Sequence, residues 1–216
     1  MAEGRGMTLH PIVPKGAGSG VLSVNGPEDM GAIRLPGVGG VICQRRLLET
    51  VLHWLETLPP EVLPTTQVIV RPGEIASAVS LACDEAGLLD TPERRILIDD
   101  IAGLATTFGE MTRTRWLRLR LDAVTTNACR RFHIDRVTAR LVCTYRGTGT
   151  QYGVARDDVP ATIHTVPTGS PFVMRGTLWP AQPDPHLLHR SPPIEGTGET
   201  RLMLALDPVT DPDDES

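Results

Sequence analysis

The sequence predicts an α+β protein in which a mainly helical segment packs on a jelly-roll-like β core. Residues 41–115 carry apolar side chains at helical spacing over most of their length. Residues 116–207 instead contain short apolar runs separated by Gly and Pro, which is typical of a sandwich or a jelly-roll barrel. The chain has 216 residues, of which 40% are hydrophobic, and this suits one substantial domain.

Both ends of the chain differ in composition from this central part. Residues 1–40 are rich in Gly and Pro and predict an arm that lies over the surface or lacks fixed structure. Residues 208–216 predict an acidic tail.

The segment 41–115 is expected to form three helices. The first spans residues 41–57 and ends before Pro59. The second spans residues 75–89, and the third begins at Pro92, after Thr91 as its N-terminal cap, and continues to about Phe108. A short strand, Gln67–Val70, is expected between the first two helices.

The β core begins at Trp116, where Leu117, Leu119 and Leu121 alternate with charged residues. This period of two predicts a half-buried strand. Further strands are expected near residues 137–145, 162–166, 171–178, 186–190 and 202–206.

The sequence indicates where the protein is located and in which state its cysteines are expected. No apolar run approaches the roughly 20 residues of a membrane span, and the N-terminus lacks the apolar stretch of a signal peptide, so we expect a cytoplasmic protein without a membrane partner. The four cysteines show no Cys-x-x-Cys spacing, and we expect them to be reduced and to fill the core: Cys43, Cys83, Cys129 and Cys143.

Charge is distributed unevenly. The net charge of −5 argues against a general nucleic-acid binder. Yet residues 113–146 contain nine Arg against only Asp122 and Asp135, which favours an anionic small molecule as co-substrate or substrate. Two other interpretations are open: solvated strand faces at Arg118 and Arg120, or a binding module without metal that docks an acidic partner.

One constellation of residues indicates chemistry. His133-Ile134-Asp135, together with His189, supplies the two imidazoles and one carboxylate of the facial triad that holds non-haem Fe(II). Arg201 follows as a cation suited to a dicarboxylate co-substrate. The alternative interpretation is a surface His and Asp in a turn, with an unrelated His downstream.

Zinc is the alternative metal. It accepts His, Asp and Cys, and Cys129 lies four residues before His133. With Cys129 as fourth ligand the site would be closed and suit a zinc-binding protein of metal homeostasis. With water in that position it would suit a zinc hydrolase.

Three blocks of the sequence resemble an uncharacterised bacterial family, domain of unknown function 1826. They are Cys129–Asp135, Arg140–Gly147 and His189–Pro193, and the resemblance covers roughly residues 40–207. It implies no established activity. Its association with zinc-responsive gene sets implies a metal-homeostasis role.

The order His-x-Asp, distal His, then Arg is similar to that of the Fe(II)- and 2-oxoglutarate-dependent oxygenases. This resemblance implies a double-stranded β-helix (cupin-like) core and an enzyme that oxidises a small molecule. His133, Asp135 and His189 would hold iron, and Arg201 would bind the distal carboxylate of 2-oxoglutarate. Arg201 follows His189 by 12 residues, slightly further than is common in those enzymes, so Arg190 competes for that role. The co-substrate would also accept hydrogen bonds from Thr144 and Tyr145.

Overall fold

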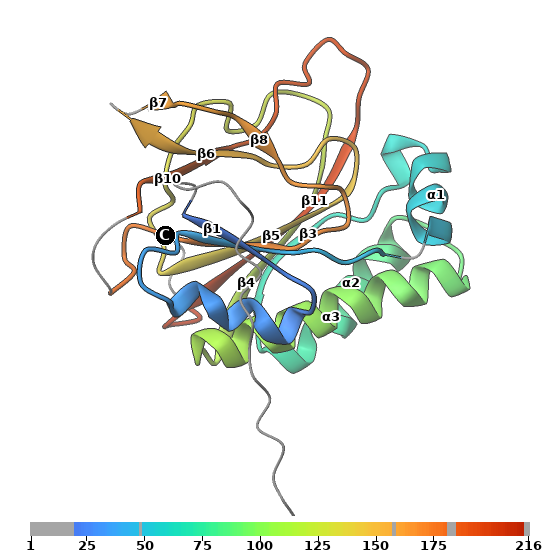
Figure 1. The fold of residues 1–216 in the computed structure, drawn as a ribbon. Helices are drawn as coiled ribbons and strands as arrows, with labels where there is room; N and C mark the ends of the chain where they lie inside the picture. Colours follow the sequence, from blue (N-terminus) through green and yellow to red (C-terminus); the bar gives the residue numbers. More distant parts are fainter. Residues whose placement is uncertain (1–19, 48, 157–158, 181–184, 214–216) are drawn as a thin grey trace, which may run out of the picture.

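Two β-sheets face each other, and helices cover the outer face of the larger one (Figure 1). The computed structural model describes residues 20–47, 49–156, 159–180 and 185–213. The larger sheet has the order β1 (Val21–Val24), β2 (Gly40–Cys43), β9 (Phe172–Arg175), β5 (Ala139–Arg146), β11 (Arg201–Val209), β4 (Trp116–Val124), β3 (Thr66–Val70). The smaller sheet has the order β10 (Leu187–Arg190), β6 (Gln151–Arg156), β7 (Val159–Pro160), and β8 (His164–Thr165) also pairs with β6.

From β4 onward the chain alternates between the two sheets. It runs from β4 to a single bridge at His133 beside β10, and back to β5 in the larger sheet. It then crosses to β6, β7 and β8, returns to β9, crosses to β10, and ends in β11. This alternation is the winding of a double-stranded β-helix, and the pairs within both sheets are antiparallel apart from β1 with β2. The predicted α+β, jelly-roll-like fold class is confirmed.

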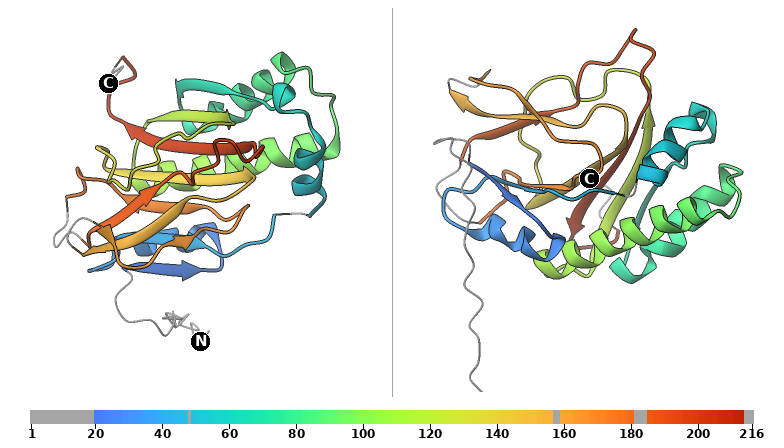
Figure 2. Two further views of the ribbon diagram at one scale, coloured as in Figure 1. Left: turned by 90° about the horizontal axis from the view of Figure 1, so that it is seen from above. Right: turned by 45° about the vertical axis from the view of Figure 1, so that its right-hand side comes forward.

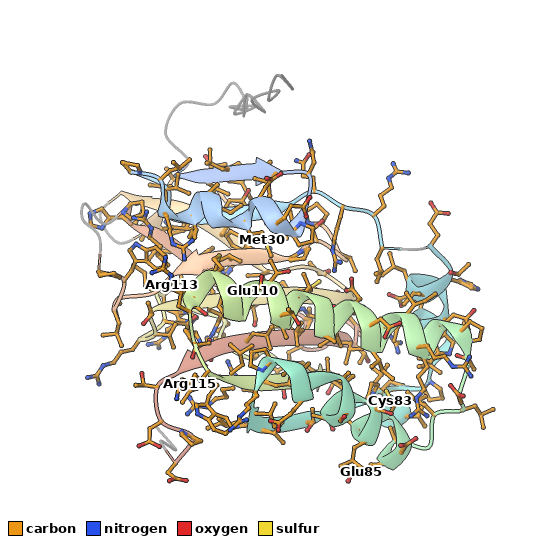
Figure 3. The ribbon with its side chains drawn as sticks, turned by 90° about the horizontal axis from the view of Figure 1, so that it is seen from below. Met30, Cys83, Glu85, Glu110, Arg113 and Arg115 are labelled. Carbon is orange, nitrogen blue, oxygen red and sulfur yellow. The ribbon has the colours of Figure 1, made fainter. Side chains whose placement is uncertain are left out.

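The helical elements lie on the outer face of the larger sheet (Figures 2 and 3). In Figure 3, η1, which carries Met30, lies beside α3 across this face. Among the described residues no helix combines the length and apolar character needed to cross a membrane. The elements are η1 (Pro27–Arg34), α1 (Glu49–Thr57), η2 (Pro60–Val62), η3 (Pro72–Glu74), α2 (Ile75–Glu85) and α3 (Pro92–Thr112).

The longest helix, α3, begins and ends for reasons visible in its sequence. Thr91 caps it, because its hydroxyl accepts a hydrogen bond from the Arg94 amide at 3.2 Å, and Pro92 occupies the first turn. The helix ends at Arg113, which adopts a left-handed conformation with φ of 55°. A stripe of buried residues on α3 packs against the sheet: Leu97, Ile101, Leu104 and Phe108.

Each strand of the larger sheet sends alternate side chains to opposite faces. On β4 the outer face carries Leu117, Leu119 and Leu121, all fully buried under the helices. On β5 and β11 the inner face carries Val142 and Ala205, which join a second apolar cluster with residues of the smaller sheet such as Leu187. The protein therefore has two cores, one on either side of the larger sheet.

Several predicted boundaries were wrong. Residues 20–40, expected as a surface arm, provide β1 and η1, and η1 buries Met30 and Ile33 completely. Residues 41–43, expected as the start of a helix, belong to β2, because pairing with β9 decides their conformation. The strand β6 was not anticipated, and β11 extends to Val209, two residues into the expected acidic tail. Residues 1–19 and 214–216 lie outside the described residues.

Candidate metal centre

Two histidines are brought side by side by a backbone bridge between the 125–138 connection and β10. The amide of His133 donates to the carbonyl of His189 and the amide of His189 donates to the carbonyl of His133, both at 3.0 Å. Residues in such a pair have side chains on the same side of the sheet, and the two imidazole centroids are 4.5 Å apart. A sequence separation of 56 residues is thus closed by one short antiparallel contact.

Asp135 completes a group of three potential ligands. His133 Nε2 lies 3.4 Å from Asp135 Oδ1, and His189 Nε2 lies 2.9 Å from Asp135 Oδ2. One ligand atom from each residue fits within 4.8 Å of the other two. Two atoms bonded to one ion at about 2.1 Å lie roughly 3.0 Å apart at a right angle and roughly 3.4 Å apart at the tetrahedral angle. The two separations, which involve different oxygens of Asp135, lie in the range found between neighbouring ligand atoms of one ion.

The hydrogen bonds around these three residues leave the ligand atoms available. His133 Nδ1 is 2.8 Å from the carbonyl oxygen of Arg131, which can only accept, so Nδ1 carries the proton and Nε2 presents its lone pair. Asp135 Oδ2 is buried and lies 2.9 Å from His189 Nε2, but it accepts no well-aligned hydrogen bond within the described part of the chain. A buried carboxylate oxygen without a donor is unfavourable unless a cation binds it. The donor set fits a divalent metal ion.

The Asp135 carboxylate contacts Arg140, which also forms an ion pair with Asp207. Arg140 Nη1 lies 2.6 Å from Asp135 Oδ1, while Nε and Nη2 of the same guanidinium each donate to a different oxygen of Asp207 at 2.7 Å. The Asp207 side chain is only 2% exposed, so it is screened from water. Such bidentate pairing fixes the plane of the guanidinium and, through it, the orientation of the Asp135 carboxylate.

The three candidate ligands titrate abnormally for identifiable reasons. Burial acts to raise the pKa of Asp135, but contacts with both imidazoles and the charge of Arg140 outweigh it and hold the pKa well below its usual range. The hydrogen bond with Asp135 raises the pKa of His133. Burial lowers the pKa of His189, which favours the neutral imidazole that a metal requires.

Gly176 supports the connection that carries Asp135. The amides of Thr177 and Leu178 donate to the carbonyls of Asp135 and Val137, at 2.9 and 3.1 Å. A Cβ atom at Gly176 would lie 1.9 Å from the carbonyl oxygen of Val137, so the two backbones approach this closely only with glycine. No local sequence pattern marked this glycine as part of the site.

Arg201 is completely buried on the same inner face of the larger sheet. Its Nε donates to the carbonyl of Thr148 at 2.6 Å, and Nη2 donates to the Thr144 hydroxyl at 3.3 Å. Among the described residues, no carboxylate forms an ion pair with it. Burial lowers the pKa of Arg201 to about 10, although the charge of Glu199 acts in the opposite direction. A buried guanidinium without an ion-pair partner is suited to receive an anion.

The structure places two other predicted site residues, Arg190 and Tyr145, with their side chains directed away from the triad. Arg190 lies on β10 beside His189 but faces the other way, where it stacks on Phe132 and donates to Gln151 Oε1 at 2.8 Å. The Tyr145 hydroxyl points to the helical side and donates to Asp100 at 2.6 Å.

Cys129 is exposed, so the expectation that it fills the core was wrong, whereas Cys43, Cys83 and Cys143 are buried as expected. Cys129 lies in the connection that leaves the sheet before His133, and its carbonyl accepts from the Ser191 amide. Among the described residues, the group of potential metal ligands at this site contains no cysteine.

A cavity of about 480 Å³ lies elsewhere, between η1 and α3 on the outer side. It is lined by polar residues that include Arg45 and Asp100, and the latter also holds the Tyr145 hydroxyl. None of the three candidate ligands lines it, so it is separate from the metal centre.

Comparison with known proteins gives a family and a set of distant structural relatives. The family described as "Protein of unknown function (DUF1826)" matches residues 25–207. No curated protein shows significant similarity to the chain.

Among solved structures, the dioxygenase for auxin oxidation 1 of Arabidopsis thaliana, in its binary complex with 2-oxoglutarate, is 12% identical, with 80% of this chain and 84% of that chain covered and a TM-score of 0.47. The rice dioxygenase for auxin oxidation is 13% identical, with 90% and 84% covered and a TM-score of 0.47. An oxidoreductase of the 2OG-Fe(II) oxygenase family from Burkholderia pseudomallei is 17% identical, with 84% and 90% covered and a TM-score of 0.42.

Proposed function

The chain belongs to the protein family of unknown function DUF1826, and we propose that it is a mononuclear non-haem Fe(II) oxygenase that uses 2-oxoglutarate to oxidise a small molecule. The supporting observation is a pairing of two features between the sheets. One is a His-Asp-His group in which a buried carboxylate oxygen accepts no well-aligned hydrogen bond, and the other is a buried arginine that forms no ion pair with a described carboxylate.

The triad would hold the iron. His133 and His189 would bind through Nε2, and Asp135 through one carboxylate oxygen. Three protein ligands leave coordination positions open, which is the arrangement of Fe(II) oxygenases. Arg140 would keep the Asp135 carboxylate oriented, and the bond from His133 Nδ1 to Arg131 would keep that imidazole in the binding tautomer.

Arg201 would bind the distal carboxylate of 2-oxoglutarate. A guanidinium and a carboxylate form strong charge-assisted hydrogen bonds, and burial strengthens them because water does not compete. Thr144 both accepts from Arg201 and lies on the inner face of β5, two residues from Val142 of the inner core, so its hydroxyl can donate to the same carboxylate. Arg140 and Thr144 lie four residues apart on that face, so the metal side and the carboxylate side share one surface.

Iron and 2-oxoglutarate would together supply the oxidising chemistry, and the protein would supply binding, orientation and exclusion of water. A closed zinc site with Cys129 as fourth ligand has less support, because that side chain is exposed and outside the ligand group. A closed zinc site would also provide no anion for the buried Arg201 to bind.

The proposal is tested by calorimetric titration of 2-oxoglutarate into Mn(II)-loaded protein, in which no turnover occurs. Replacing Arg201 with Gln should weaken 2-oxoglutarate binding about 30-fold or more, since breaking a buried charge pair costs about 2 kcal/mol or more. Metal content should stay the same. Arg190→Gln is the matched control, because Arg190 faces away from the site, and it should bind 2-oxoglutarate as the wild type does.

Two results would count against the proposal. Loss of metal in Arg201→Gln would assign that arginine a structural role. If Arg190→Gln strongly weakened 2-oxoglutarate binding and Arg201→Gln did not, the co-substrate would bind at Arg190 and not at Arg201.

A further inference from the structure

Arg120 is a second arginine of the inner face whose charge the protein leaves largely uncompensated. It lies on β4, pairs with Ala205 of β11, and shares the face that Ala205 presents to the space between the sheets. Its side chain is 28% exposed, yet its Nε is buried and meets no hydrogen-bond acceptor among the described residues. Its nearest described carboxylate oxygen is Asp207 Oδ2, at 3.8 Å from Nη2, which is beyond hydrogen-bond range.

The carboxylates near Arg120 are already engaged. Both oxygens of Asp207 accept from Arg140 at 2.7 Å, and the third nitrogen of Arg140 contacts Asp135. Asp135 would in turn bind the metal ion. Thus one arginine uses both nearby carboxylates, and Arg120 remains without a counter-ion of its own.

The flanking residues do not change this balance. Arg118 and Asp122 lie on the same face of β4, two residues to either side of Arg120, and contribute one charge of each sign. On β3 the residue paired with Arg120 is the uncharged Gln67, and on β11 it is Ala205. A metal ion adds further positive charge, and 2-oxoglutarate would be taken up by that ion and Arg201. A surplus of positive charge therefore remains at Arg120.

We propose that Arg120 binds an anionic group of the substrate, a carboxylate or a phosphate, next to the metal centre. The inference rests on the proposed function, because it assigns the substrate class of the same site. A guanidinium has planar N–H donors that match the geometry of such oxyanions. Nε, which has no acceptor, is one of the donors available for bidentate binding. Arg120 is connected through Asp207 and Arg140 to Asp135, so the anion would bind on the same inner face as the triad.

The test is calorimetric titration of the full chain, loaded with Mn(II), with inorganic phosphate and separately with acetate at constant ionic strength. Each titration is run with and without saturating 2-oxoglutarate. With saturating 2-oxoglutarate, which occupies Arg201, the wild type should still bind one anion saturably, because Arg120 and Arg201 are separate sites. Arg120→Gln should weaken this binding at least tenfold while leaving 2-oxoglutarate binding unchanged.

Two further variants make the test specific. Arg115→Gln is the control, because Arg115 is exposed and precedes β4, on the side seen in Figure 3, so it should bind phosphate normally. Arg120→Lys keeps the charge but loses the fork, and should weaken binding less than Arg120→Gln. It also decides the matter if Arg120→Gln does not fold.

The outcomes separate this proposal from the previous one. Absence of saturable phosphate and acetate binding, or equal binding by wild type and both Arg120 variants, would overturn the assignment of Arg120. So would displacement of the anion by 2-oxoglutarate together with its loss in Arg201→Gln, because Arg201 would then be the anion site. Failure of 2-oxoglutarate to bind would instead overturn the oxygenase proposal, whatever phosphate does.

Discussion

The two faces of the larger sheet carry side chains of different kinds: apolar on the outer face and partly charged on the inner face. On the outer face, Leu119 of β4 and Leu204 of β11 are fully buried among apolar residues of the helices. One residue further along the same strands, Arg120 and Ala205 face the smaller sheet. There the charged groups include Asp207 and Arg201, which are buried, and Arg140, which is partly buried.

This difference shows where stability and function reside. Apolar burial on the outer face provides folding free energy roughly in proportion to its area. Burying charged groups on the inner face costs desolvation energy, and their mutual attraction offsets only part of that cost. The outer face therefore stabilises the fold, while the inner face carries the candidate site at a cost in stability. Substitutions on the two faces should therefore have separable effects.

The largest effect on stability is expected on the outer face, at Leu119. Replacing it with Ala leaves a cavity in the helical core and should lower the free energy of unfolding by about 2–5 kcal/mol. Metal bound per folded molecule should not change, since the side chain points away from the triad. Urea denaturation and metal analysis measure the two quantities. A parallel loss of metal at temperatures where the variant stays folded would break the distinction between the faces.

An effect on both quantities is expected at Gly176, which touches the metal connection. Its replacement by Ala would place a Cβ 1.9 Å from the carbonyl of Val137, so the connection must shift. Overpacking of this kind costs about 1–3 kcal/mol, and the shift should also reduce metal affinity, measured by competition with a chelator.

Gly103 provides the control for this substitution. It lies exposed on α3 with no other atom within 4 Å of an added Cβ. Gly103→Ala should stabilise the protein by about 0.5–1 kcal/mol, because alanine favours a helix, and leave metal affinity unchanged. Equal metal loss in both glycine variants would contradict the support role of Gly176.

At Asp207 the effect of interest is on metal affinity per folded molecule, since loss of this buried charge also lowers stability. Asp207→Asn keeps the shape but removes the charge that holds Arg140, so the guanidinium should draw closer to Asp135 and compete with the metal. Metal affinity should fall about 10–100-fold, as for other residues that orient ligands. The exposed pair of Asp90 and Arg95 is the control, and Asp90→Asn should leave affinity unchanged. Unchanged affinity in Asp207→Asn would show that Arg140 does not position the carboxylate.

Much of the fold could be predicted because local patterns and tertiary packing agree there. Thr91 and Pro92 mark the start of α3, and the alternation of leucine and arginine marks β4. The strand β2 was mistaken for helix because its apolar residues run into the helical pattern that follows, and only pairing with β9 distinguishes them. The strand β6 contains Gly153, which lowers strand propensity, and the structure needs it because a Cβ would lie 2.3 Å from the carbonyl of Thr162.

The candidate site shows the same division. The His-x-Asp motif and the distal histidine could be found because each is recognisable in the sequence by itself, and the structure brings them together. The pair of Arg140 and Asp207 spans 67 residues and depends on strand register, so no local signal announces it. The arginines of β4 were open to interpretation as a solvated face, because alternation reveals two faces but not which sheet lies opposite.

We propose above that the inner face binds Fe(II) and 2-oxoglutarate together at the triad. The most direct measurement is an anaerobic titration of the apo-protein with Fe(II) and then 2-oxoglutarate, followed by visible absorption. Chelation of the keto acid by iron should give a weak metal-to-ligand charge-transfer band that is absent in His189→Ala and needs more 2-oxoglutarate to appear in Arg201→Gln. Absence of the band in the wild type, together with tight retention of zinc, would contradict the claim and favour a role in metal homeostasis.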